Sequence, residues 1–184
     1  MTMEEILRDI KKELRAAMNG ILSAQMRQAG MPYKLIFGVE LPRLQSIAAE
    51  FTPSRRLAQE LWNQNIRECK LLAFMLMPPE ELLPEVAEIW VDESPTAECI
   101  QMMVMLLLQR QRWAAEMGFQ WIASESRNRQ LAGMLLIARL LAGGAELNPR
   151  SHTELLNQLQ SLEPQADLHL QKAILAVRNN LPEE

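Results

Sequence analysis

The sequence predicts an all-α protein built as a solenoid of antiparallel helical pairs. Of its 184 residues 48% are hydrophobic, and Leu, Met, Ala and Ile, which favour helices, supply most of this apolar bulk. Aromatic residues make up only 5% of the chain. The seven glycines and ten prolines are few, and they separate segments whose apolar residues recur with the period of a helix. Such a chain folds as helices joined by short turns.

About eleven helices are expected from this periodicity and from the turn residues between them. In the first segment Ile6, Ile10 and Leu14 share one face, with charges opposite, as in an amphipathic surface helix. Ser94-Pro95-Thr96 offers a hydroxyl cap followed by proline at the first helical position, which predicts a helix start. The expected helices cover residues 3–18, 21–29, 41–51, 53–63, 66–77, 80–91, the segment from this start to 109, 113–124, 127–142, 152–162 and 167–181.

The helical pairs follow one another every 30 to 40 residues or so, which is the spacing of helical repeats. We therefore expect one HEAT-like or ARM-like α-α superhelix over residues 1–184, with the helices of residues 1–30 packing on the repeats. A compact helical bundle is the competing architecture. The solenoid is favoured because the segment 66–77 is apolar nearly all round, as a helix sandwiched between neighbours must be.

The formal net charge of −4 argues against a chain that binds polyanions over its whole surface, although it allows a local basic groove. Two cysteines, Cys69 and Cys99, and an N-terminus without a signal-like pattern predict a reduced, cytoplasmic protein with buried, inert thiols. The longest apolar run, residues 102–108, is too short to span a membrane.

Motifs of classical catalysis are missing from the sequence. His152 and His169 are seventeen residues apart with no paired cysteines, so both are expected at the surface and no metal site is predicted. Gly143-Gly144 follows a helix instead of a strand, which excludes a phosphate-binding loop there. No serine nucleophile elbow is present. We expect neither a metal nor a cofactor.

Charged residues cluster near helix starts. Glu68 and Glu98 each open an apolar helix and precede a cysteine, and both are expected to face solvent, stabilised by the helix macrodipole. Basic residues at helix starts gather along one edge if the pairs stack in register, and such an edge can follow a phosphate backbone. A solvated face of mixed charge is the alternative. These basic residues are Arg55, Arg56, Arg67, Lys70, Arg127, Arg129 and Arg150. The four tryptophans are expected mostly in the core; they are Trp62, Trp90, Trp113 and Trp121.

Several segments resemble one known family. The stretch from Phe37 to Leu44, FGVELPRL, is followed by Leu61-Trp62 and by Glu68 to Ala73; together they are similar to the N-terminal half of the AlkD-like DNA alkylation repair family. Trp121 to Ser124 and Gln171 to Ile174 resemble later helices of that family, so the resemblance covers roughly residues 25–180 in order. It implies a HEAT-like solenoid, in agreement with the helical pattern.

The resemblance also implies a reaction and a site. Active members of the family are DNA glycosylases that remove positively charged alkylated purines from duplex DNA held in a basic, concave cleft. An aspartate there stabilises the sugar cation, and tryptophans and an arginine frame the nucleotide. The aspartate corresponds to Glu98 if a short gap is allowed and to Thr96 if it is not; one tryptophan, the arginine and the later tryptophan correspond to Ser94, Leu131 and Ala176. Most of the family's catalytic positions are thus replaced.

Two functions follow. The first is a divergent DNA-binding repair protein with duplex DNA as its partner. Its candidate nucleic-acid-binding residues are Arg43, Arg67, Arg127, Arg129 and Lys172, and Glu98 is its candidate catalytic residue if glycosylase activity of the 3-alkylpurine type remains. The alternative is a non-catalytic scaffold that holds a protein on its concave face. It uses Met102, Met103 and Met105, because methionine adapts to varied partners.

Overall fold

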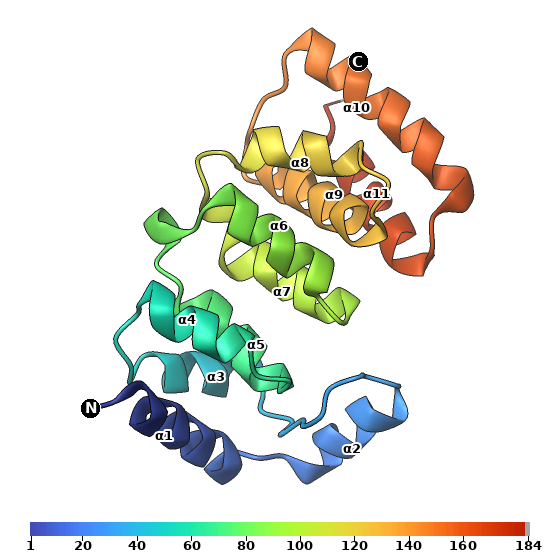
Figure 1. Ribbon diagram of the computed structural model, residues 1–184. Coiled ribbons are helices and arrows are strands. Elements are labelled where there is room, and N and C mark those ends of the chain that lie inside the picture. The colour runs from blue at the N-terminus through green and yellow to red at the C-terminus, as the bar shows by residue number, and fades with distance from the viewer. Residues whose placement is uncertain (183–184) are drawn as a thin grey trace. The chain divides into compact units, whose positions relative to one another are not determined.

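The computed structural model describes residues 1–182, and within them it is all-α, as predicted (Figure 1). The described part of the chain contains no β-strand, and its one β-type pairing is an isolated bridge between Leu35 and Ile66. The helices are α1 (Met3–Ala16), α2 (Gly20–Gln28), α3 (Leu41–Ala48), α4 (Arg55–Trp62), α5 (Arg67–Leu76), α6 (Pro84–Glu93), α7 (Ala97–Leu106), α8 (Ala114–Ile122), α9 (Arg127–Ala142), α10 (Pro149–Leu162) and α11 (Leu168–Asn180). Three short 3-10 helices follow α5, α7 and α10: Pro79–Glu81, Leu108–Arg110 and Glu163–Gln165.

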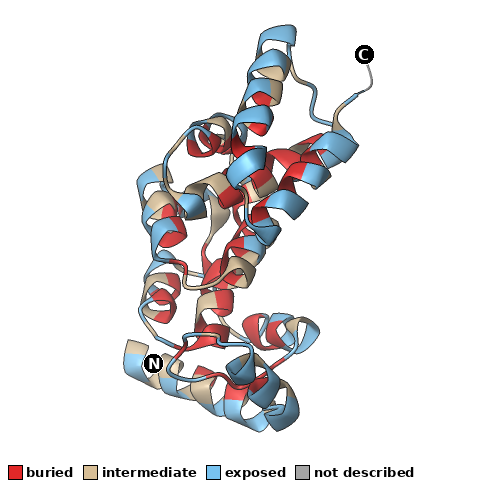
Figure 2. Cartoon of the chain, turned by 90° about the vertical axis from the view of Figure 1, so that its right-hand side faces the viewer, coloured by how far each residue is buried: buried red, intermediate tan, exposed pale blue. Residues whose placement is uncertain are grey.

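The chain divides into two compact units, unit 1 (Met1–Leu82) and unit 2 (Leu83–Glu184). In both, buried residues line the inner sides of the helices and exposed residues the outer sides (Figure 2). The prediction of a single repeat domain over residues 1–184 stays a prediction.

Two helix boundaries differ from the sequence-based expectation, one at a proline and one at a serine. The expected helix 80–91 is split, because Pro84 cannot continue a helix that started before it and instead opens α6. At the start of α7 the capping side chain is Thr96, whose hydroxyl accepts the amide of Cys99 at 3.0 Å. Ser94 was the expected cap, but its hydroxyl donates to the Trp90 carbonyl at 2.7 Å and closes the preceding helix instead.

Unit 1 packs α3 and α4 against α5, and α1 against α3. The aromatic part of this core is a tilted pair, Trp62 and Phe74, whose ring centroids lie 5.8 Å apart. Lys70 places its ammonium 4.1 Å from the centre of the Trp62 ring and also donates to the Trp62 carbonyl at 2.7 Å. This cation–π contact fixes the Lys70 side chain in place.

A buried carboxylate anchors the loop that precedes α3. Glu68 is fully buried and accepts the backbone amides of Phe37, Gly38 and Val39 at 3.0, 2.8 and 3.2 Å. The guanidinium of Arg67 donates to the same carboxylate at 2.9 Å and to the Val39 carbonyl at 3.3 Å. The expectation that Glu68 faces solvent is therefore wrong: its position in the first turn of α5 points it at three amides of another segment, and these amides replace water.

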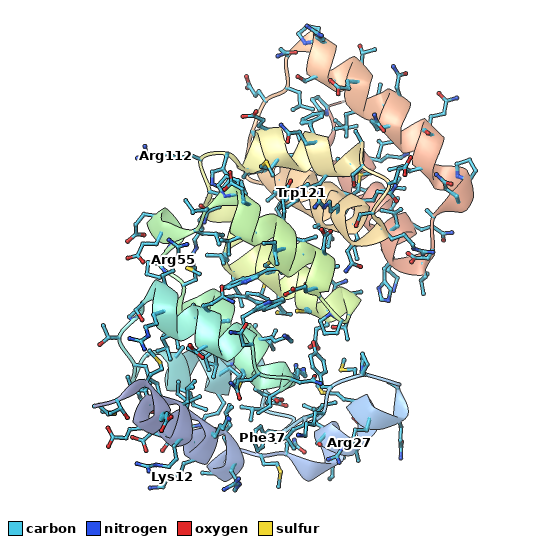
Figure 3. All side chains as sticks on the ribbon, in the orientation of Figure 1. Lys12, Arg27, Phe37, Arg55, Arg112 and Trp121 are labelled. Carbon is cyan, nitrogen blue, oxygen red and sulfur yellow. The ribbon has the colours of Figure 1, made fainter. Side chains whose placement is uncertain are left out.

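Helix α2 closes the other side of this loop. The Ser23 hydroxyl donates to the Ile36 carbonyl at 2.7 Å, and the backbone N–H of Asn19 donates to the Phe37 carbonyl at 3.0 Å. Figure 3 labels Phe37 and Arg27 on the two segments; the Arg27 guanidinium donates to the Ser23 hydroxyl at 2.6 Å. The loop between α2 and α3 is thus held by backbone and side-chain hydrogen bonds from both flanks.

Unit 2 is organised around α9, which contacts α6, α7, α8 and α11. The closest of these contacts is with α8, where two glycines, Gly118 and Gly133, let the helix backbones approach. A Cβ added to Gly133 would lie 2.6 Å from the Gly118 carbonyl oxygen and 2.9 Å from the Ile122 nitrogen. Trp121, labelled in Figure 3, is buried in this part of the unit and donates its indole N–H to Glu88 at 3.2 Å.

Replacing Gly133 by alanine is expected to lower the free energy of unfolding of unit 2. The added methyl group meets backbone atoms that cannot move aside without separating α8 from α9, and such overpacking typically costs about 1–3 kcal/mol. Urea unfolding followed by circular dichroism measures the change. Gly143→Ala is the matched control, because its added Cβ meets the nearest atom at an ordinary 3.4 Å. Equal stability of the two variants would contradict the close packing of the helices.

The remaining expectations for the core are confirmed. Three of the four tryptophans are almost completely buried, and Trp113 is partly exposed. Both cysteines are buried and neither is part of a disulfide, and desolvation raises the pKa of Cys69 to about 12. No helix among residues 1–182 combines the length and the apolar character needed to cross a membrane.

Candidate nucleic-acid interface

The starts of three helices meet at one pocket of unit 2. Helices α7, α9 and α11 begin after the N-caps Thr96, Ser126 and Asp167, which lie 30 and 41 residues apart along the chain, as the repeat spacing predicts. The pocket encloses about 200 Å³. Its lining residues are Ser94, Pro95, Thr96, Ala97, Ile100, Arg127, Asn128, Leu131, Asp167, His169 and Leu170. Unpaired backbone amides and the positive ends of helix dipoles favour a negatively charged ligand at such a place.

The pocket combines an apolar floor with a charged rim. Ile100, Leu131 and Leu170 are buried and supply the floor. On the rim, the exposed Arg127 pairs with the carboxylate of Asp167. An apolar floor suits the flat face of a base, and a guanidinium suits a phosphate group.

Asp167 is the carboxylate of this pocket, and it is held in its ionised form. It accepts the backbone amide of Leu170 at 2.9 Å as N-cap of α11. This hydrogen bond, with the one from Arg127, lowers the pKa of Asp167 below its ordinary value of 3.8. The carboxylate is thus a charged acceptor that is already partnered.

Two further side chains lock the start of α9 to the end of α6. The Asn128 amide donates to the carbonyls of Val91 and Ser94 at 3.0 and 3.1 Å. Arg129 binds Asp92 with two hydrogen bonds of 2.9 and 2.7 Å, and lies 3.5 Å from Glu88. The hydrogen bond from Arg129 is the main cause that lowers the pKa of Asp92. These contacts fix one wall of the pocket.

Stability of the protein is expected to fall as the pH drops below about 4. The pKa values of Asp92 and Asp167 are lowered in the folded state, so their stabilising contribution is complete above their unfolded value of about 3.8 and is lost as the pH falls through the folded values. Both side chains are more than 40% exposed, so each contributes at most about 1 kcal/mol. Urea unfolding of the wild type and of Asp92→Asn at about pH 6 and about pH 3 measures how the free energy of unfolding changes with pH. Glu125→Gln controls for loss of a negative charge, and an unchanged pH dependence in Asp92→Asn would contradict the assignment.

The pocket brings together the positions that the family resemblance singled out without a gap. Ser94, Thr96 and Leu131 all line it. Glu98 lies in the first turn of α7, half-buried, and is not among the lining residues. Ala176, the fourth position, lies on α11 about two turns beyond the pocket.

The five predicted nucleic-acid-binding residues have different surroundings. Arg127 lines the pocket, Arg129 supports it through Asp92, and Lys172 is exposed on α11. In unit 1, Arg43 is exposed and lies 3.7 Å from Glu13, whereas Arg67 is buried with its guanidinium on Glu68. Because its guanidinium is buried, Arg67 cannot contact a nucleic acid in this structure.

Sequence reasoning missed the other polar residues of the pocket, which are Asn128, Asp167 and His169. The N-cap pattern Asp-x-x-Leu before α11 marks Asp167 as a helix start, but the pairing with Arg127 spans 40 residues and has no local signal. Among the described residues no group of three or more His, Cys, Asp or Glu side chains is placed to hold a metal ion.

The methionines proposed for a protein-binding surface are mostly covered. Met103 is fully buried, and Met102 and Met105 are partly buried. They therefore provide core packing more than an adaptable surface.

Comparisons with known proteins agree with the fold. A solved structure described as "A new family of proteins related to the HEAT-like repeat DNA glycosylases with affinity for branched DNA structures" superposes with a TM-score of 0.79 at 18% identity, covering 98% of this chain and 75% of that one. A search of curated proteins found no match. The sequence model described as "DNA alkylation repair enzyme" matches residues 10–175. Because this match spans nearly the whole chain, the protein belongs to the DNA alkylation repair enzyme family.

Proposed function

We propose that this protein binds DNA and that the pocket at the starts of α7, α9 and α11 receives a nucleotide without cleaving its glycosidic bond. The observation that carries the proposal is the meeting of three helix starts, the Arg127 guanidinium and the family positions Ser94, Thr96 and Leu131 in one pocket. The affinity of the structural neighbour for branched DNA supports DNA as the ligand.

The pocket favours binding over catalysis. Cleavage by the family's reaction needs an anionic side chain beside the sugar cation, aligned by a rigid aromatic frame. Thr96 and Ser94 stand where the ungapped match expects the aspartate and the tryptophan. Asp167 is anionic, but Arg127 already compensates its charge. Glu98 lies outside the lining.

Binding is tested by fluorescence anisotropy with a linear duplex, a duplex carrying 7-methylguanine and a three-way junction, between about 50 and 200 mM salt. Base release is followed in the same samples. We expect salt-sensitive binding without release of the base. Arg127→Gln is expected to weaken binding and to reduce the salt slope by about 1. Arg150→Gln, an exposed arginine in the first turn of α10 outside the pocket, is the matched control.

Three outcomes would overturn the proposal in different ways. If the protein does not bind DNA even at low salt, DNA is not its ligand. If Arg127→Gln and Arg150→Gln weaken binding equally, the pocket is not the site of DNA binding. Release of the base restores an enzymatic function, and its loss in Glu98→Gln or in Asp167→Asn identifies the carboxylate responsible.

A further inference from the structure

The acidic charge of the chain is unevenly distributed between its two units. Unit 1 carries eleven basic and ten acidic residues and is close to neutral, whereas unit 2 carries eight basic and thirteen acidic residues. Within unit 1 a single helix, α1, holds four of the eleven basic and four of the ten acidic residues. The net charge of α1 is therefore zero, and a positive surface arises only if its charges are separated onto different sides of the helix.

Charges on α1 are sorted by face. Arg8, Lys11, Lys12 and Arg15, spaced three and four residues apart, fall on one side of the helix and, with Glu4 and Leu7, line one surface depression. We call these four residues the α1 cationic face. Of the acidic residues of α1, Glu4 lies on this same side, whereas Asp9 and Glu13 fall on a second side. A third side holds Ile10 and Leu14, which are fully buried. Because the apolar side is fixed in the core of unit 1, the direction of the cationic face is fixed as well.

Several cations of this face repel one another within the helix. Arg8 and Lys12, and also Lys11 and Arg15, are like charges four residues apart, and each such pair destabilises a helix by about 0.2–0.5 kcal/mol. The helix is secured by other means, since Thr2 and Glu5 form a reciprocal capping box at its start. Glu4, four residues before Arg8, and Arg15 in the last turn offset part of this repulsion.

The cations of this face are also largely unpaired. Within residues 1–182, Arg8, Lys12 and Arg15 are exposed and make no ion pair, and the Lys11 ammonium donates to the neutral Gln64 amide at 2.8 Å. In Figure 3 the labelled Lys12 points away from the helices of its unit. Glu13, which follows Lys12 in the sequence, lies on another side of the helix and 3.7 Å from Arg43.

We infer that the α1 cationic face is a second DNA-contacting surface, which binds the phosphate backbone of a duplex. The inference rests on the proposed function, because it assigns a further contact for the same ligand. Arg8, Lys12 and Arg15 span about 10 Å along the helix axis at 1.5 Å per residue. One strand of B-DNA presents a phosphate every 3.4 Å or so of its axis, so the face covers about three phosphates. The cations of this face contact only phosphate groups, so DNA binding there has no sequence preference.

A membrane surface is the competing partner for a basic amphipathic helix, and the packing of α1 disfavours it. Helices that lie on membranes insert their apolar side into the lipid. In α1 that side is occupied, since Ile10 and Leu14 have no exposed area. Only the cationic side is left to contact a partner, and exposed cations are sufficient to bind a phosphate backbone.

The test compares two variants that lose the same charge. Arg8→Gln/Lys12→Gln/Arg15→Gln removes the exposed cations of the α1 face with residues that favour helices. Lys34→Gln/Arg112→Gln/Arg139→Gln removes three exposed cations from other segments of the chain. Both are titrated with the linear duplex and the three-way junction over the same salt range, with circular dichroism to confirm equal helix content. Vesicles containing phosphatidylserine serve as the membrane probe.

The α1 variant is expected to lower the salt slope of DNA binding by about 2–3, since each phosphate contact contributes about 0.9. The control variant is expected to keep most of the wild-type slope. An α1 variant that binds like wild type, or equal losses in both variants, would overturn the inference while leaving DNA binding through the pocket intact. Binding to vesicles that the α1 variant loses, with DNA binding unchanged, would assign the face to a membrane. Absence of any DNA binding by the wild type would instead overturn the proposed function.

Discussion

Replacing Glu68 by alanine is expected to lower the free energy of unfolding of unit 1 by about 3–5 kcal/mol, because it leaves the buried Arg67 guanidinium without its counter-ion. It also leaves the buried amides of Phe37, Gly38 and Val39 without their acceptor. Urea unfolding measures the loss, and hydrogen exchange of these three amides locates it.

The control for this change is Glu40→Ala, which removes an exposed glutamate at the start of α3 whose side chain makes no capping hydrogen bond. It is expected to change stability by less than about 0.5 kcal/mol. A Glu68→Ala variant as stable as this control, with the amides still protected, would show that another group anchors the loop. Arg67→Met is expected to be milder than Glu68→Ala, since the carboxylate keeps its three backbone donors.

The second large effect is expected at the middle of the same loop. Gly38 has φ +75°, and a Cβ added there would lie 2.5 Å from the Asn19 carbonyl oxygen and 2.6 Å from the Ser23 nitrogen. The left-handed conformation costs about 1–2 kcal/mol for alanine. The collision with the backbone of α2 adds about 1–3 kcal/mol. Gly38→Ala is therefore expected to lose about 2–5 kcal/mol in urea unfolding.

Gly30→Ala separates the two causes. Gly30 also has a positive φ, +86°, but a Cβ added there meets no atom within 4 Å. Its substitution thus measures the conformational cost alone, and the difference between the two variants measures the close approach of α2 to the loop. Equal losses would mean that α2 moves aside without penalty.

Most helices of this fold could be predicted because their signals are local. Apolar residues at helical spacing, a hydroxyl or amide cap and a following glycine or proline lie within one segment, and α9 from Arg127 to Ala142 was bounded correctly on that basis. The helix expected at residues 80–91 was wrong for an equally local reason, the neglected Pro84.

The candidate site was harder to predict because its partners are distant in sequence. A glutamate in the first turn of a helix is usually exposed, and nothing near Glu68 indicates the three amides thirty residues upstream. The pocket has the same difficulty: Arg127 was selected for its charge and position, but its partner Asp167 starts another helix. Only the packing of α7, α9 and α11 brings these segments together.

The two buried thiols make the protein convenient for labelling. Cys69 and Cys99 have no exposed surface, and burial holds the pKa of Cys69 at about 12, so its reactive thiolate is scarce at neutral pH. Maleimide dyes are therefore expected to react only with cysteines introduced at the surface, such as Lys12→Cys on α1 and Lys172→Cys on α11. Because the native cysteines need not be removed, energy transfer between two such dyes measures the distance between α1 and α11. The measurement is made in the free protein and with each DNA probe bound.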